Sequence, residues 1–412
     1  MKKSIIALAL ATMPLFVNAA STELSQTGVN GVTVQLTGSY YAPNDKESVQ
    51  ETTPVIEFEG LTKKGGQQIV EGYRSEFGKH VFKETIKEKL AAVDAVLTEE
   101  QKLSVLKTKE QMADYPEIFD FYSGMAEATG YSLDEVYLAA WSSDGLFADS
   151  INGLAVELFE YLGEATSKTR GCTALAFNNG ISGQNQDMPI EFAGLGAIWK
   201  SKNLIVHAPE PFFTPIVMGR NVANNTNTVD AFLDGAIEHG VPAGAISMAV
   251  ISKAKSTDDV VKALDKVEVN AAYSFTMTDT SGNALLIETT QGDNIVIDGS
   301  ERGWVVQANH PVGQEEELVN KYANGDYTTF NETVKYTLWR QEAAESAARY
   351  TPTKDKAALK DLFAKRPILQ MPYEGNGFVS TNSIIHDLNE GCSYGTTWVP
   401  TMQEYTKVCF DK

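Results

Sequence analysis

The chain of 412 residues has little cysteine, little histidine and a shortage of positive charge. It contains three cysteines and five histidines, and its 34 Lys and Arg face 54 Asp and Glu, which gives a formal net charge of −20. Binding to nucleic acid or to an anionic membrane depends on Lys and Arg that neutralise phosphates, so this balance argues against both partners. The histidines show no spacing typical of a metal site or a catalytic triad, and we expect no metal and no organic cofactor. They are His80, His207, His239, His310 and His386.

Long apolar runs are also missing, except at the N-terminus. Two lysines precede the largely apolar run 5–17, and small residues that a signal peptidase accepts follow it. The run is shorter than the roughly 20 apolar residues that cross a bilayer, and Pro14 interrupts it. We therefore expect residues 1–20 to be a bacterial signal peptide, cleaved after Ala19 or Ala20. The mature protein is then periplasmic or secreted, with no membrane anchor.

The three cysteines divide into a pair and a single residue. Cys392 and Cys409 lie 17 residues apart in the last segment, on two predicted strands. In an oxidising compartment they are candidates for a disulfide. Cys172 is then left unpaired, and an unpaired cysteine in an exported protein is either buried and inert or chemically employed.

The first half of the chain has a helical pattern. It extends from about 62 to 162 and contains two capping-box sequences, "TEEQ" at 98–101 and "SLDE" at 132–135. Another helix is predicted over 147–162, followed by a polar loop over 163–170. The composition then changes, immediately before Cys172.

The second half mixes strands and helices. Alternating residues predict a strand over 173–177, and "NNG" at 178–180 predicts a hairpin turn into a second strand that leads to Asp187. Helices followed by mixed strands and helices indicate an α+β fold. The further predicted strands are 273–278, 284–290 and 303–308, and the further predicted helices are 256–268, 331–349 and 355–365, with strands again at the end of the chain.

The dipeptide Gly171-Cys172 suits self-cleavage. A thiol can attack the carbonyl of the preceding residue, and Gly171 has no Cβ to block its approach. Water then cleaves the thioester and leaves a cysteine with a free α-amino group, whose pKa is about 8. Such a residue supplies both nucleophile and base, so no catalytic histidine is needed. The alternative is an ordinary small cysteine at the start of a strand.

The longer string "RGCTALAFNNGISGQNQDMP" at 170–189 resembles the penicillin acyltransferase family (acyl-coenzyme A:6-aminopenicillanic acid acyltransferase and its bacterial relatives), a branch of the N-terminal nucleophile hydrolases. The family pattern is Gly-Cys-Thr, a strand, a turn and Gly-Gln-Asn-x-Asp. Three more stretches resemble family segments in the same order, so the likeness covers roughly 55–310. They are "FYSGMAEATGYSLDEVYLAAW" at 121–141, "FTMTDTSGNALLIETT" at 275–290 and "WVVQANHP" at 304–311.

The resemblance implies a four-layer αββα core and specific roles for site residues. Cys172 would be the nucleophile, exposed by cleavage after Gly171. Asp187 would hold the new α-amino group, and Asn309 would donate its amide to the oxyanion of the tetrahedral intermediate. His310 follows the family pattern, but we assign it no chemical role.

The implied domain organisation is a mostly helical segment, 21–171, released as a separate chain that stays associated with the hydrolase core, 172–412. The implied activity is that of a cysteine amidohydrolase or acyltransferase acting on a small N-acyl amide through a thioester. Two alternatives remain: a lipid-acyl hydrolase on the same fold (phospholipase B-like or ceramidase-like), and an acidic binding protein that has lost catalysis. A papain-like protease is disfavoured, because its nucleophile begins a helix whereas Cys172 precedes a predicted strand.

Some positions depart from the family pattern. Gln307 and Ala308 stand where the family has His-Thr, and "GRNVANNTNTVDAFLDG" at 219–235 does not align with the expected Gly-x-Asn-x-x-Gly segment. Some relatives carry a late arginine near the active site, but neither Arg340 nor Arg366 falls at the expected place. We therefore transfer neither arginine.

Overall fold

The structure is a computed structural model of the chain. It describes residues 22–27, 33–38, 52–144, 171–189, 194–213, 215–229, 240–289, 294–312, 332–371 and 378–412. The predicted signal peptide, the predicted helix over 147–162 and the predicted loop over 163–170 lie outside the described residues.

Helices form most of the first described part, as the sequence predicts. Both capping boxes are confirmed: Thr98 and Gln101 cap each other's backbone, and so do Ser132 and Glu135. A further helical stretch covers 133–144. The named elements of this part are the paired strands β1 (Thr22–Thr27) and β2 (Thr33–Gly38), strand β3 (Val55–Glu57), helices α2 (Lys63–Phe77), α3 (Val81–Val96), α4 (Glu99–Lys107) and α5 (Glu117–Thr129), and the 3-10 helix η1 (Thr108–Met112).

One of the two large sheets has eight strands. Its neighbours are antiparallel except for the parallel pair of β6 and β3 at one edge. Helices α7 (Ala243–Ile251) and α8 (Thr257–Leu264) cover its outer face. In spatial order the strands are β12 (Ile295–Asp298), β11 (Ala284–Thr289), β10 (Tyr273–Asp279), β9 (Val222–Thr228), β8 (Ile216–Gly219), β7 (Leu204–Ala208), β6 (Ala197–Lys200) and β3.

The other large sheet has six antiparallel strands, and helices α10 (Glu332–Tyr350) and α11 (Lys356–Phe363) cover its outer face. Cys392 and Cys409 lie opposite each other on its last two strands and form a disulfide. In spatial order the strands are β13 (Trp304–Gln307), β4 (Thr173–Phe177), β5 (Ile181–Pro189), β14 (Phe378–Asp387), β15 (Cys392–Thr396) and β16 (Thr406–Cys409).

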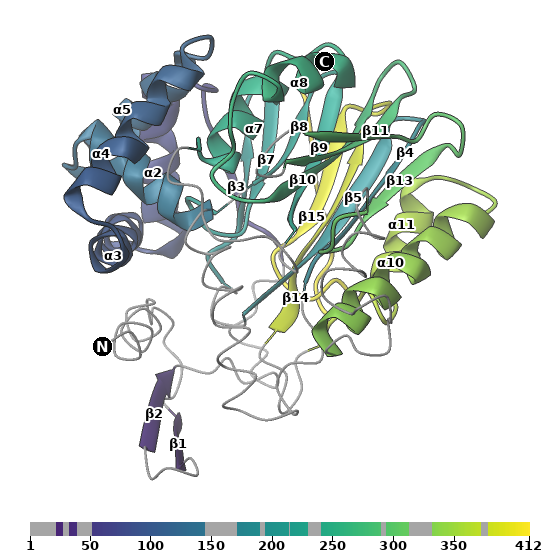
Figure 1. Cartoon of the computed structure of the whole chain (residues 1–412), viewed down its shortest axis with the longest axis horizontal. Coiled ribbons are helices and arrows are strands. Elements are labelled where there is room, and N and C mark those ends of the chain that lie inside the picture. The colour runs from purple at the N-terminus through teal and green to yellow at the C-terminus, as the bar shows by residue number, and fades with distance from the viewer. Residues whose placement is uncertain are drawn as a thin grey trace.

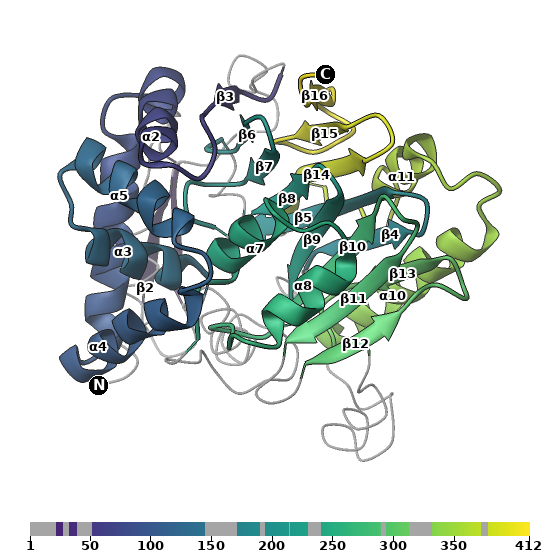
Figure 2. The same cartoon turned by 90° about the horizontal axis from the view of Figure 1, so that it is seen from above.

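The two sheets stack face to face between the two pairs of helices, so the core has the layer order αββα (Figure 1). The predicted α+β class and layer order are confirmed. Helices α2 to α5 pack beside the eight-stranded sheet (Figure 2), where the rings of Phe121 and Trp199 lie 6.3 Å apart. One apolar core therefore joins the helical first part to the rest of the chain. Among the described residues, none of the helices is both long and apolar enough to cross a membrane.

The interior between the sheets is partly polar. His207 on β7 and His386 on β14 bind the same hydroxyl group, that of Ser393 on β15, at 2.6 and 2.8 Å. Both histidines are buried. Burial lowers the pKa of His207 and lowers that of His386 to about 3, so both rings are neutral at pH 7.

Above the unfolded pKa of about 6.5, a histidine whose pKa is lowered on folding is neutral in both the folded and the unfolded state. As the pH falls toward the folded pKa, only the unfolded state takes up the proton, so the free energy of unfolding decreases. We predict that the wild-type protein loses about 2 kcal/mol more free energy of unfolding between about pH 8 and pH 5 than the His386→Gln variant. The glutamine can still bind the Ser393 hydroxyl but does not titrate. Urea unfolding at the two pH values measures the difference, and equal losses would show that His386 does not titrate with unfolding.

Candidate active site

Cys172 lies at the start of β4, where β4 pairs with β5 on one side and β13 on the other. Its side chain is almost fully buried, and its Sγ lies 4.0 Å from the backbone oxygen of Asp187. Of the described cysteines it is the one that is not in a disulfide. The structure thus brings two of the predicted catalytic residues together through the pairing of adjacent strands.

Asn309 follows β13 and lies directly against Gly171. A Cβ atom added to Gly171 would be 2.0 Å from Oδ1 of Asn309, far inside the contact limit. Gly171 also has a φ of +104°, a backbone conformation that favours glycine. A glycine at position 171 therefore permits both this backbone conformation and the close approach of the Asn309 side chain.

Arg340, on α10, joins Asn309 to the start of β4. Its side chain is fully buried. It donates from Nη1 to the backbone oxygen of Cys172 and, at 3.0 Å, to the hydroxyl of Thr173, and from Nη2 to Oδ1 of Asn309 at 2.8 Å. The family pattern in the sequence does not point to Arg340, but the structure places it beside Cys172 and Asn309. Arg366, the other candidate, is exposed.

The place of Arg340 on α10 marks it as a site candidate once the burial of the helix is known. It lies on the same face of α10 as Ala344 and Ala348, which are both buried. A charged residue in a stripe of buried alanines needs hydrogen-bond partners in the interior, and it is for that reason a site candidate.

Asn227 is a second residue that the sequence did not single out. It lies on β9, whose residues are all buried although five of seven are Asn or Thr. Its Nδ2 points to the backbone oxygens of Ala308 at 2.5 Å and Cys172 at 3.4 Å. Asn309 donates in turn to Oδ1 of Asn227 at 3.2 Å and to the backbone oxygen of Thr228 at 2.9 Å. Two amide side chains, one from each sheet, thus meet beside Cys172.

The carboxylate of Asp187 is buried, and its two oxygens differ in their hydrogen bonding. The hydroxyl of Ser380 donates to Oδ1 at 2.6 Å, and Oδ2 has no hydrogen-bond partner within the described part of the chain. Burial raises the pKa of Asp187 to about 7, although the positive charge of Arg340 opposes the shift. A cation placed at Oδ2 would remove this cost of burial.

Helix α10 also holds the segment that carries Asn309. Thr337 accepts the backbone N–H of Asn309 at 2.8 Å, and Gln341 accepts that of Ala308 at 2.8 Å. His310 bonds the same Thr337 hydroxyl at 3.1 Å, and burial together with Arg340 lowers the pKa of His310 to about 3. The neutral, buried His310 therefore helps to hold the segment that carries Asn309.

The comparisons with known proteins agree with the two later motifs, at 275–290 and 304–311. The family model of acyl-coenzyme A:6-aminopenicillanic acid acyl-transferase matches residues 225–355, which include Asn227, Asn309 and Arg340 but not Cys172 or Asp187. The predicted resemblance to this family is confirmed. No curated protein sequence matches the chain.

Two kinds of solved structure are similar to the chain. Penicillin V acylase from Agrobacterium tumefaciens is 14% identical with a TM-score of 0.35, over 55% of this chain and 83% of the acylase. A variant of conjugated bile acid hydrolase from Clostridium perfringens is 13% identical with a TM-score of 0.37, over 59% of this chain and 98% of the hydrolase.

The contact between Gly171 and Asn309 predicts the effect of a single methyl group. In a Cys172→Ala background, which lacks the thiol, we expect Gly171→Ala to lower the free energy of unfolding by about 2 kcal/mol more than Gly194→Ala. Gly194 is a matched control, because its φ is +101° but no described atom lies within 4 Å of its Cβ position. Equal losses in urea unfolding would mean that the site relaxes around the added methyl group.

Proposed function

We propose that the chain is an exported, self-processing N-terminal nucleophile enzyme that hydrolyses an N-acyl amide through a thioester on Cys172. The observation that carries this proposal is that Asn309 and Arg340 meet at Gly171 and Cys172, with Asp187 on the neighbouring strand β5. These side chains come from different elements, and two of them carry charge in a buried position.

The first step of the proposal is self-cleavage. The thiol of Cys172 adds to the carbonyl carbon of Gly171, the C–N bond breaks, and the nitrogen takes the thiol proton to become the new α-amino group. Water then hydrolyses the thioester and releases Gly171 as a carboxylate. The tight contact of Gly171 with Asn309 supports this step, because it holds the scissile residue against an amide side chain.

Asp187 would hold the new terminus. Within the described part of the chain its buried Oδ2 accepts no hydrogen bond, and the backbone oxygen of the same residue lies 4.0 Å from Sγ of Cys172. An α-ammonium group on Cys172 would supply the missing donor. The added positive charge would lower the pKa of Asp187 from its raised value and keep the carboxylate ionised.

Substrate turnover would repeat the same chemistry. The acyl group of the substrate takes the place that Gly171 leaves beside Asn309. The α-amino group accepts the thiol proton and passes it to the leaving amine. The oxyanion would be stabilised by the amides of Asn309 and Asn227 and by the charge of Arg340, once these donors exchange their present acceptors for it. Those acceptors are Oδ1 of Asn227 and the backbone oxygens of Ala308 and Cys172. Water then releases the acid.

Hydrolysis is preferred over transfer because acyl-coenzyme A donors are not expected in the periplasm or the medium. The two chains that self-cleavage produces would remain associated. Asn270 of the core donates to the backbone oxygen of Trp141 at 3.0 Å, and the N–H of Gly244 donates to Asp144 at 2.9 Å. These bonds join residues on either side of the cleavage point.

The test of this function is a covalent intermediate. We expect an N-acyl anilide substrate to give a burst of aniline and an acyl group on the peptide that begins with Cys172, sensitive to hydroxylamine and visible by mass spectrometry. Cys172→Ala should lower the rate by about a thousandfold or more, and Asp187→Asn by about a hundredfold.

The alternatives give different results. A lipid-acyl hydrolase would form the adduct with phospholipid or ceramide but not with small amides, and a binding protein without catalysis would form it with neither. Cys172→Ser controls for folding, because the hydroxyl replaces the thiol with little change in volume. An unchanged rate in Cys172→Ala would exclude Cys172 as the nucleophile.

A further inference from the structure

Ser380 lies directly opposite Asp187 because strand β14 contains a bulge. Ser380 pairs with Asp187 of β5, but the next paired residue of β14 lies two positions later, where Asn382 pairs with Gln186. Directly opposite residues lie on the same face of a sheet, so a regular register would place Thr381 beside Asp187 instead. Bulges recur next to active sites, where they redirect side chains. Here the bulge brings a fully buried serine hydroxyl to the carboxylate.

The backbone of Gln370 fixes the direction of the Ser380 hydroxyl. The N–H of Gln370 donates to Oγ of Ser380 at 2.9 Å, and the N–H of Ser380 donates to the backbone oxygen of Gln370 at 3.0 Å. Because a backbone N–H can only donate, Oγ accepts there, and its single hydrogen remains for Oδ1 of Asp187 at 2.6 Å. This distance is typical of a hydroxyl that donates to an ionised carboxylate. Oδ1 is therefore an acceptor, and a proton on Asp187 would sit on Oδ2.

Helix α10 holds Gln370 in turn. Nε2 of Gln370 donates to the hydroxyl of Tyr336 and, at 2.9 Å, to the backbone oxygen of Pro367, which also accepts the Tyr336 hydroxyl. The guanidinium of Arg340, one turn further along α10, lies over the Tyr336 ring, 5.3 Å from its centroid. These contacts form a buried chain that connects Arg340 with Asp187.

Three influences act on the protonation of Asp187 in the uncut chain. Burial raises its pKa to about 7, whereas the positive charge of Arg340 on α10 and the hydroxyl of Ser380 on β14 both act to lower it. Self-cleavage would add the α-amino group of Cys172, at the start of β4. A proton on Oδ2 would compete with that α-ammonium group for the same oxygen.

We propose that Ser380 is a positioning residue for Asp187: its hydroxyl holds Oδ1 and leaves Oδ2 as the oxygen that binds the α-amino group of Cys172. This inference rests on the proposed function, because it concerns the N-terminus that self-cleavage would create. Ser380 also keeps the carboxylate ionised, since a hydrogen bond to a carboxylate favours its charged form. Without that bond, a proton takes the place of the α-ammonium group at a higher pH.

The first test measures the pKa of Asp187 without turnover. In a Cys172→Ala background, which lacks the thiol, the carboxyl carbon of Asp187 is isotope-labelled, assigned with Asp187→Asn and titrated by NMR. We expect Ser380→Ala to raise the pKa by about one unit, because the carboxylate loses one hydrogen bond to its charged form. Ser380→Cys keeps nearly the same volume but donates weakly, so it should give a smaller rise.

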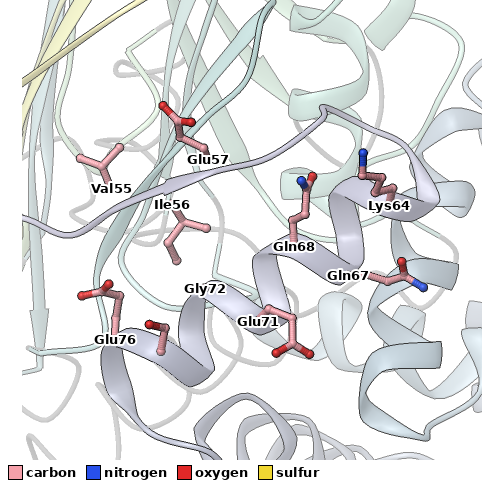
Figure 3. A pocket seen from close by; sticks show the side chains of 10 residues that line it. Val55, Ile56, Glu57, Lys64, Gln67, Gln68, Glu71, Gly72 and Glu76 are labelled. Atoms are coloured by element: carbon pink, nitrogen blue, oxygen red, sulfur yellow. The ribbon is translucent and has the colours of Figure 1, made fainter.

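Two control variants separate this effect from a loosened fold and from a change in net charge. Ser383→Ala removes another buried hydroxyl of β14, one that bonds the Tyr405 hydroxyl at 2.6 Å. Glu76→Gln removes an exposed charge that lines a groove of about 350 Å³ between β3 and α2 (Figure 3). Neither variant should move the pKa of Asp187. An equal rise in Ser383→Ala, or no rise in Ser380→Ala, would overturn the proposal.

The second test uses turnover by the self-cleaved enzyme. We expect Ser380→Ala to move the acidic limb of the kcat/KM profile up by about one pH unit, which lowers kcat/KM about tenfold on that limb. Ser383→Ala should leave the limb in place. A limb that does not move in Ser380→Ala would contradict the positioning role. If the wild-type chain stays uncut and hydrolyses no amide, the proposed function fails instead, and the titration still decides whether Ser380 holds the carboxylate.

Discussion

The buried guanidinium of Arg340 is the interaction on which the site depends. It connects the start of β4 with the side chain of Asn309, and its helix also fixes the backbone of Ala308 and Asn309 through Gln341 and Thr337. A charge without solvent is tolerated only when hydrogen bonds compensate it, so removing these acceptors would destabilise the interior. The same hydrogen bonds fix the position of Asn309 relative to Cys172 and Thr173.

Local signals predicted much of the fold. The two capping boxes mark helix starts because their side chains bond the nearest free N–H groups, and the alternation over 173–177 marks β4 beside its hairpin. The strands β6 to β9 were not predicted. Both faces of these strands are covered, by helices on one side and by the other sheet on the other, so they lack the alternation that identifies a strand with one solvent face.

The site was predictable only where a family motif marks it, as at 170–189 and at 304–311, which contains Asn309. Cys172 and Asp187 lie on adjacent strands of one hairpin, so a single motif carries both. Arg340 and Asn227 reach the site from α10 and β9, and their approach depends on how the two sheets stack, which no local pattern encodes. Their one visible sign was polarity in a buried stripe or strand, and this becomes informative only after burial is known.

The proposed mechanism requires Cys172 to become the first residue of a new chain. Intact mass and N-terminal sequencing of the purified mature protein, beside Cys172→Ala, measure this. We expect two chains of roughly 17 and 26 kDa at about 110 Da per residue, the larger beginning Cys-Thr-Ala, and one uncut chain in the variant. A single uncut, folded chain in both proteins would contradict self-processing and would leave Cys172 as a buried cysteine at the start of a strand.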